Sequence, residues 1–272
     1  MIQIALSITL LFYLNVAPGQ IVRTSSPAIF NGLNTSGSRG SEAFLFTTNQ
    51  AALPDSTALY FAVLSEQKFG IRGLEAHQLA VLIPVNGAYF GVSGSYIGNM
   101  EYREGGLSLA YGLNLGSRVS AGVQFNRYVV RTKGYGGASS VNMEGSLKLQ
   151  VTPQLQFGLH LYNPSRSRWS KGEGGALPRI YSVLLAYEVS GKVVLQTAIR
   201  KGENSAAGVV SGIQYVFAPR MVARAGIDSS TGSFLFGSGL KLKLCWIQLT
   251  ISRHPQLGFT PGLMLTYHLP GK

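Results

Sequence analysis

The chain has 272 residues, of which 46% are hydrophobic and only 12% are charged. The charged share is about half of that in an average soluble domain, which argues against an ordinary soluble surface. The net charge of +12 suits either a nucleic acid or an anionic lipid surface. Because Lys and Arg stand singly at strand ends and in loops, and not clustered on one element, we predict no nucleic-acid partner.

The first 19 residues have the pattern of an export signal. An apolar run over residues 4–16 precedes the small residues Ala17 and Gly19, which have the spacing that signal peptidase prefers. Residues 1–19 are therefore predicted to be a cleaved signal peptide that directs the chain across the inner membrane. The alternative is an ordinary buried N-terminal strand or helix.

The next segment, residues 20–55, mixes turn formers with one amphipathic piece at 41–53. We expect a short helix at this piece. The segment is predicted to pack into or under the body of the protein, where it could act as a plug.

From residue 56 onward the hydrophobic pattern repeats every two residues, which indicates β-strands. Most of these segments are about ten residues long, the length that a tilted strand needs to cross a bilayer, whereas globular strands average about five or six. Beyond the first segment, no apolar stretch approaches the length of a membrane helix. The fourteen expected strands are 57–64, 74–84, 87–97, 101–113, 118–130, 139–150, 154–163, 179–188, 192–200, 206–217, 220–228, 231–240, 244–253 and 260–269.

Short and long connections alternate along this series. The connections after the fourth, sixth, eighth, tenth and twelfth strands are short: NLGS, VTP, VSGK, APR and KLK. Those after the intervening strands are mostly longer, so all short turns lie at one end of an up-and-down barrel, as in outer-membrane proteins. We predict an all-β fold in which residues 56–272 form a single transmembrane barrel of about 14 antiparallel strands.

The two faces of these strands differ. In RVSAGVQFNRY, apolar residues such as Val123 and Phe125 alternate with polar ones such as Gln124. We expect the apolar faces to contact lipid and the small or polar faces to enclose a lumen; a soluble β-sandwich is the alternative. At 180–200 both faces are apolar, which indicates either a plug packed inside that sector or an incorrect register.

Five polar residues of neighbouring strands are expected to face the lumen together. Such a network either satisfies its own hydrogen bonds or forms a solute path. The residues are Gln124, Glu144, Lys148, Gln150 and His160.

The longest expected loop contains SRSRWSKGEGG, in which Arg166, Arg168 and Lys171 flank Trp169. If the loop lies outside the cell, these residues could contact the phosphates of lipopolysaccharide or a partner protein. The alternative is a solvated, mobile loop.

Catalytic and metal-binding patterns have little support. The four His residues have no HExxH, CxxC or carboxylate cluster near them. Ser252 and His254 are the nearest Ser–His pair, but they adjoin Pro255, where a turn is the simpler explanation. We predict no enzyme activity, no metal and no cofactor.

The stretch GSRGSEAFLFTTNQAAL (37–53) resembles the N-terminal signature of the PorV/PorQ-like outer-membrane proteins of the Bacteroidetes, relatives of the FadL transporters. The signature places are filled by Gly37, Arg39, Asn49, Gln50 and Ala51. KFGIRGLEAHQLAVLIPV, LHLYNPSRSRW, ARAGIDSSTGSFLFGSGLKLK and SRHPQLGFTPGLMLTYHL look like further segments of that family, so the similarity covers nearly all of the mature chain.

The resemblance implies a fourteen-stranded FadL-like barrel in the bacterial outer membrane, in contact with lipid and lipopolysaccharide and without enzyme activity. It implies a non-catalytic accessory or cargo-contacting role in type IX secretion, with secretion-system proteins or secreted cargo as partners. The alternative is a FadL-like transporter whose partners are small hydrophobic solutes.

Overall fold

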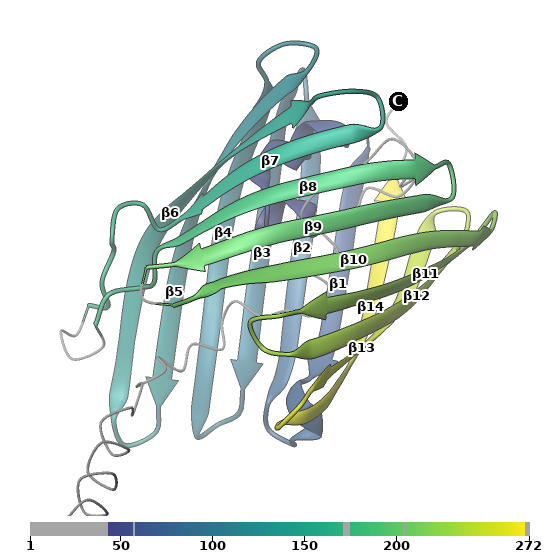
Figure 1. Cartoon of the computed structure of the whole chain (residues 1–272). Coiled ribbons are helices and arrows are strands. Elements are labelled where there is room, and N and C mark those ends of the chain that lie inside the picture. The colour runs from purple at the N-terminus through teal and green to yellow at the C-terminus, as the bar shows by residue number, and fades with distance from the viewer. Residues whose placement is uncertain (1–42, 57, 171–174, 204, 270–272) are drawn as a thin grey trace, which may run out of the picture.

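The computed structural model describes residues 43–56, 58–170, 175–203 and 205–269. Fourteen antiparallel strands pair in chain order, and β14 closes onto β1 to complete one barrel (Figure 1). The predicted all-β barrel is confirmed. Its strands are β1 (Leu59–Gln67), β2 (Glu75–Val85), β3 (Ala88–Gly98), β4 (Tyr102–Asn114), β5 (Val119–Thr132), β6 (Gly136–Gln150), β7 (Leu155–Tyr162), β8 (Ile180–Ser190), β9 (Val193–Gly202), β10 (Ala207–Ala218), β11 (Met221–Asp228), β12 (Ser233–Lys241), β13 (Cys245–His254) and β14 (Gly258–Leu269).

The two ends of the barrel differ in their connections. One end, the short-turn end, holds the turns that follow the even-numbered strands, together with the start of β1 and the end of β14. The other, the loop end, holds the connections that follow the odd-numbered strands, the longest of which spans 163–179. The alternation that the sequence predicts is only partly observed. The connections after β1 and β7 have 7 and 17 residues, whereas the other loop-end connections have three or four, no more than the longest turns of the short-turn end.

The connection between β5 and β6 is shorter than expected. The sequence predicts a loop over 131–140, but only residues 133–135 separate the two strands. Gly134 and Gly136 have φ angles of 80° and 86°, which glycine adopts without steric cost. The chain can therefore turn within three residues, and the rest of the expected loop continues the strands.

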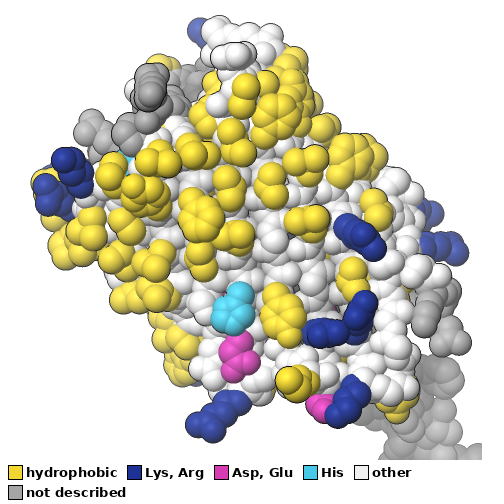
Figure 2. All heavy atoms as spheres, turned by 180° about the vertical axis from the view of Figure 1, so that it is seen from behind, with side chains coloured by type: hydrophobic (Ala, Val, Ile, Leu, Met, Phe, Trp, Pro, Cys, Tyr) yellow, Lys and Arg dark blue, Asp and Glu magenta, His cyan; other side chains and the backbone are white. Residues whose placement is uncertain are grey.

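The outside of the barrel is covered by apolar side chains (Figure 2). Val92, Leu109 and Phe125 lie side by side on β3, β4 and β5, and Leu109 and Phe125 are each 55% exposed. A soluble monomer rarely exposes so large an apolar surface. The alternation of the sequence thus places its apolar faces outward.

The register at 180–200 follows the same rule. Tyr181, Val183, Leu185 and Tyr187 of β8 point outward and are exposed. The inward side is apolar as well, with a buried cluster formed by Leu184, Ala186, Ala198 and Val210. The cluster contains no residue of 43–56, so within the described residues neither an incorrect register nor a plug accounts for the apolar interior of this sector.

Within its described part, the N-terminal segment has two short 3₁₀ helices, η3 (Leu45–Thr47) and η4 (Gln50–Asp55), where the sequence predicts one helix over 41–53. Asn49 between them is extended, with φ −154° and ψ 97°, which interrupts the helical path. A third 3₁₀ helix, η5 (Lys68–Gly70), follows β1. No helix among the described residues is long and apolar enough to cross a bilayer.

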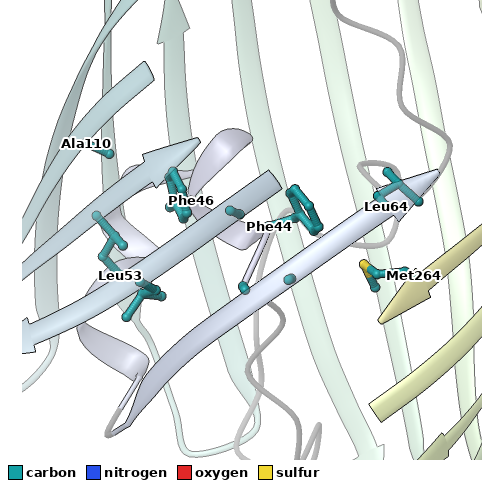
Figure 3. Close-up of a cluster of buried hydrophobic side chains, with 10 residues drawn as sticks. Phe44, Phe46, Leu53, Leu64, Ala110 and Met264 are labelled. Carbon is teal, nitrogen blue, oxygen red and sulfur yellow. The ribbon is translucent and has the colours of Figure 1, made fainter. Parts of the chain in front are cut away.

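The segment formed by residues 43–56, hereafter the inner segment, lies inside the barrel (Figure 3). Phe44, Phe46 and Leu53 are almost fully buried against inward residues of the wall. These wall residues include Leu64 of β1, Ala80 and Leu82 of β2, Ala110 of β4 and Met264 of β14. The main hydrophobic core is thus the contact between the inner segment and one side of the barrel. The predicted signal peptide and the signature residues Gly37 and Arg39 lie outside the described residues.

Candidate functional site

A cavity of about 420 Å³ occupies the lumen toward the loop end. Thr47 and Thr48 of the inner segment contribute to its lining, and Phe69 enters from the connection between β1 and β2. Polar residues line the cavity on most strands. On β3 to β7, hereafter the polar side, they include Ser93, Ser95, Ser108, Gln124, Glu144 and His160, and on β8 to β13 they include Ser182, Arg200, Asp228, Ser233, Ser252 and His254. The apolar lining residues include Phe69, Tyr128, Ile180, Leu184, Leu235 and Leu257.

Glu144 is the centre of the polar side. One carboxylate oxygen, Oε2, lies 2.8 Å from Nε2 of His160, and the other accepts a 2.7 Å hydrogen bond from Nδ2 of Asn126. Gln124 donates to Asn126 at 2.7 Å, and Asn126 also donates to Asn142 at 3.0 Å. A buried carboxylate needs such partners to offset its lost hydration. Three of the five predicted lumen residues thus meet in one cluster on β5, β6 and β7.

Lys148 and Gln150 belong to different contacts. Lys148 is buried beside Asp55 of η4 and forms an ion pair with it. Gln150 lies at the short-turn end of β6, where it accepts a 2.7 Å hydrogen bond from Gln156 and donates to the carbonyl of Thr152. These two residues therefore do not join the cluster around Glu144.

The inner segment is attached to this polar side of the wall at three points. Gln50 donates to Glu144 at 3.3 Å, and the backbone N–H of Ala51 donates to Ser146 at 2.7 Å. The third point is the pair of Asp55 with Lys148. Burial raises the pKa of Asp55 above its ordinary value, and the nearby Lys148 ammonium partly opposes that rise.

Two wall glycines make room for the inner segment. A Cβ atom at Gly122 of β5 would lie 2.4 Å from the carbonyl carbon of Gln50, and one at Gly112 of β4 would lie 2.8 Å from Cβ of Leu53. Neither position accepts a side chain while the segment stays in place. The glycines of these strands thus permit a close approach of backbone to backbone.

The signature residues Asn49, Gln50 and Ala51 are all buried in the inner segment. Gln50 and Ala51 contact β6 directly, as described above. Their role in this structure is to hold the segment against the wall.

The long connection 163–179 folds back on the barrel. Arg166 pairs with Glu203, and Trp169 packs against the buried cluster of Tyr128, Tyr162 and Leu177. Ser170 donates its backbone N–H to the carbonyl of Ser139 at 2.8 Å. The connection therefore covers the part of β6 that β7 is too short to pair.

Of the four loop residues singled out from sequence, Arg166 and Arg168 are exposed and Trp169 is partly buried. Lys171 lies outside the described residues. Any contact of this loop with lipopolysaccharide or a protein remains a proposal that rests on the exposed arginines.

Ser252 and His254 both line the cavity. Nδ1 of His254 faces the backbone N–H groups of Gln256 and Leu257 at 3.2 and 3.3 Å, so this histidine participates in the turn. Within the described ranges, no three His, Cys, Asp or Glu residues are grouped closely enough to hold a metal ion.

Sequence reasoning missed Asn126, Asn142 and Asp55. Asn126 and Asn142 have the same strand parity as Gln124 and Glu144, so the period-two rule could have found them. Asp55 had no such signal, because its partner Lys148 is 93 residues away.

No protein-family profile matches the chain, and no curated protein is detectably similar to it in sequence. Solved structures do share its fold. The CymD monoaromatic hydrocarbon channel aligns with a TM-score of 0.63 and 11% identity over 90% of this chain and 97% of the channel. The toluene transporter TbuX of Ralstonia pickettii gives 0.61 and 10% over 89% and 99%. A FadL homologue of Pseudomonas aeruginosa gives 0.59 and 10% over 88% and 96%.

At these identities the similarity shows the fold alone. The named neighbours are described as a channel, a transporter and a FadL homologue, not as enzymes. They support the wider resemblance to FadL-like barrels and give no support to the narrower assignment to PorV and PorQ.

Proposed function

We propose that the chain is a bacterial outer-membrane barrel that binds small hydrophobic solutes in its lumen and passes them across the membrane. The apolar outer surface matches the hydrocarbon layer of a bilayer. The two longest connections, 68–74 and 163–179, both lie at the end opposite to the start of β1 and the end of β14, as long loops do in outer-membrane barrels. In this orientation the loop end faces outward and the short-turn end faces the periplasm. Residues 1–19 serve as the signal peptide.

The observation that carries the proposal is a group of apolar side chains, hereafter the apolar wall, that β8 and β12 present to the cavity beside Ser182 and Ser233. Ile180, Leu184 and Leu235 turn hydrophobic side chains into the lumen, a place where an open aqueous pore would have polar ones. A dry cavity of about 150 Å³ already binds benzene in another protein, so about 420 Å³ is ample for one aromatic ring. Two neighbours of the same fold are described as a hydrocarbon channel and a toluene transporter.

The accessory role in type IX secretion has weaker grounds. It was implied by the resemblance to PorV and PorQ, which the structural neighbours named above do not support. No contact among the described residues favours a cargo protein over a small solute. We therefore place the solute channel first.

Uptake of radiolabelled toluene tests this proposal. Cells with an intact lipopolysaccharide layer that express the barrel should take up the label faster than cells with an empty vector. The double variant Leu184→Gln/Leu235→Gln puts two amides on the apolar wall and should lower the gain in uptake by about tenfold, because a buried polar group costs about 1–3 kcal/mol.

The matched control is Ser93→Ala, a change on the polar side of the same cavity. It should leave uptake close to that of the unchanged barrel. Immunoblotting of outer membranes and the heat-dependent gel shift of a folded barrel would verify equal amounts of folded protein. If the unchanged barrel gives no gain over the empty vector, the solute-channel function is wrong.

A further inference from the structure

A second cavity opens at the short-turn end, on the side of the barrel that η4 does not contact. It has a volume of about 730 Å³ and lies between the turns that join β8 to β9, β10 to β11 and β12 to β13. Each of these turns brings a cation to the cavity. The cationic lining residues are Lys192, Arg220, Lys241 and Lys243, and none of the described lining residues is acidic.

Backbone hydrogen bonds hold the three turns in register. The N–H of Val216 donates to the carbonyl of Lys192, and the N–H of Lys241 donates to the carbonyl of Arg220, both at 2.8 Å. The cations therefore stand on neighbouring, ordered turns. Four cations and no carboxylate among the described lining residues give this concave surface a positive local potential.

Two buried lining residues, Gln214 and Trp246, contact an arginine that does not itself line the cavity. Arg224 of β11 donates from Nε to Oε1 of Gln214 at 3.0 Å and from Nη1 to Oε1 of Gln248 at 2.7 Å. Its guanidinium carbon lies 5.4 Å from the ring centroid of Trp246, a cation–π distance. Gln214, Arg224, Trp246 and Gln248 are all more than nine-tenths buried.

Two donors of this buried group have no hydrogen-bond partner among the described residues. They are Nε1 of Trp246, which lines the cavity, and Nε2 of Gln248, which does not. The side-chain oxygens of Gln214 and Gln248 already accept hydrogen bonds from Arg224. The atoms that still lack a hydrogen-bond partner are therefore N–H donors. An unpaired buried donor costs about 1–3 kcal/mol, and an anionic acceptor would remove that cost.

We propose that this short-turn cavity binds a phosphate group carried on an apolar body. A phosphate monoester has a charge of about −1.5 to −2 at neutral pH and three acceptor oxygens, which suits several cations and the free N–H donor of Trp246 better than a carboxylate does. Val216, Val222 and Leu242 supply an apolar lining for the rest of the ligand. This site is separate from the apolar cavity of the solute channel and does not depend on that function.

Tryptophan fluorescence can report on the site directly. The chain has two Trp residues, Trp169 and Trp246, so Trp169→Phe leaves Trp246 as the single reporter. In a neutral detergent, phenyl phosphate should change this fluorescence saturably. It should bind more tightly than inorganic phosphate, which lacks the apolar body, and more tightly than benzoate, which carries less charge.

In this background, Arg220→Ala/Lys243→Ala should weaken phenyl phosphate binding by at least about tenfold, because hydrogen bonds to charged groups are being removed. The matched control is Arg118→Ala. Arg118 is an exposed cation on the turn between β4 and β5, at the same end but outside the cavity. Its loss should leave the affinity unchanged.

A short-chain phosphatidic acid distinguishes the two sources of such a ligand. Tighter binding of the lipid than of phenyl phosphate would identify a membrane headgroup as the ligand, and the reverse would identify a soluble ester. Benzoate binding as tight as phenyl phosphate, an equal response of the double variant and the Arg118→Ala control, or no saturable change would each overturn the proposal. If the double variant does not show the heat-dependent gel shift, Lys192→Gln and Lys243→Gln replace it as single variants.

Discussion

Gly122 is the residue at which the wall and the inner segment approach most closely. A Cβ atom there would lie 2.4 Å from one atom of Gln50 and 2.6 Å from two others, including Cβ. Two of the three contacting atoms are backbone atoms of Gln50, so a rotamer change cannot relieve the overlap. The absence of a side chain at this position is therefore a condition for the segment to occupy the lumen.

We expect Gly122→Val to displace the inner segment and open the barrel. Overpacking costs about 1–3 kcal/mol, which shifts the docking equilibrium by roughly one to two orders of magnitude. Single-channel recordings in planar bilayers should show a higher mean conductance than for the unchanged protein.

Gly145→Val is the matched control for this change. Gly145 pairs with Val123 on the neighbouring strand, and its Cβ would have 4.0 Å to the nearest atom, so valine fits without strain. A Gly122→Val barrel that conducts no more than the Gly145→Val barrel would contradict the role we assign to Gly122.

At the scale of single residues, the sequence alone predicts part of the polar cluster around Glu144. Alternation along β5 and β6 places Gln124 and Glu144 on the lumen side, and the same rule would include Asn126. The alternation rule cannot predict that Lys148 forms its ion pair with Asp55 and not with Glu144, which lies on the same face of β6. That choice depends on where the inner segment lies, which is a tertiary property without a local pattern.

Among the elements, the inner segment is the one whose attachment depends on pH. Burial raises the pKa of Asp55 above its ordinary value of 3.8, whereas the carboxyl of an undocked segment in water keeps that value. The docked form then binds the proton more tightly. Docking gains stability as the pH falls through the raised pKa, and this contribution is lost as the pH rises.

In the Asp55→Asn variant, the inner segment should therefore dock at least as firmly as in the unchanged chain at neutral pH. Its docking should also depend less on pH. Lys148→Met should loosen docking at neutral pH, because removing one partner of a buried pair typically costs about 3–5 kcal/mol. The measurement is the rate of maleimide modification at Ala52→Cys, a buried site of the segment, in a Cys245→Ser background.

The Asn variant also separates Asp55 from other titrating groups. Any pH dependence of docking that survives in Asp55→Asn comes from groups other than Asp55. Faster modification of the Asn variant than of the unchanged chain at neutral pH would show that the ion pair, and not the burial of the charge, dominates.

Strands were easier to predict than connections. Each strand has its own period-two signal, so all fourteen could be placed from sequence. The turn after β5 could not, because Gly134 and Gly136 mark a loop and a tight hairpin equally well. The two 3₁₀ helices were read as one helix for a related reason: the apolar spacing around Asn49 does not reveal that its backbone is extended.

For the whole molecule, the defining feature is that its apolar surface lies outside and much of its polar side-chain surface lies inside. A soluble protein has the opposite arrangement. The inversion follows from one pattern repeated along fourteen strands, and it was predictable because closure of a barrel leaves each strand only an inner and an outer face. The low charge of the chain is explained by the same arrangement.

A charged substitution on the outer surface should therefore destabilise the barrel more, the closer it lies to the centre of the membrane. Leu109 lies in the middle of β4 between Val92 and Phe125, so Leu109→Lys places an ammonium near the centre of the hydrocarbon layer. This should destabilise the barrel in lipid vesicles by about 2–4 kcal/mol. Tyr135→Lys, at an exposed turn of the loop end, should cost no more than about 1 kcal/mol. Urea titrations of both variants in phosphatidylcholine vesicles measure the difference, and equal stabilities would mean that the surface around Leu109 does not face lipid.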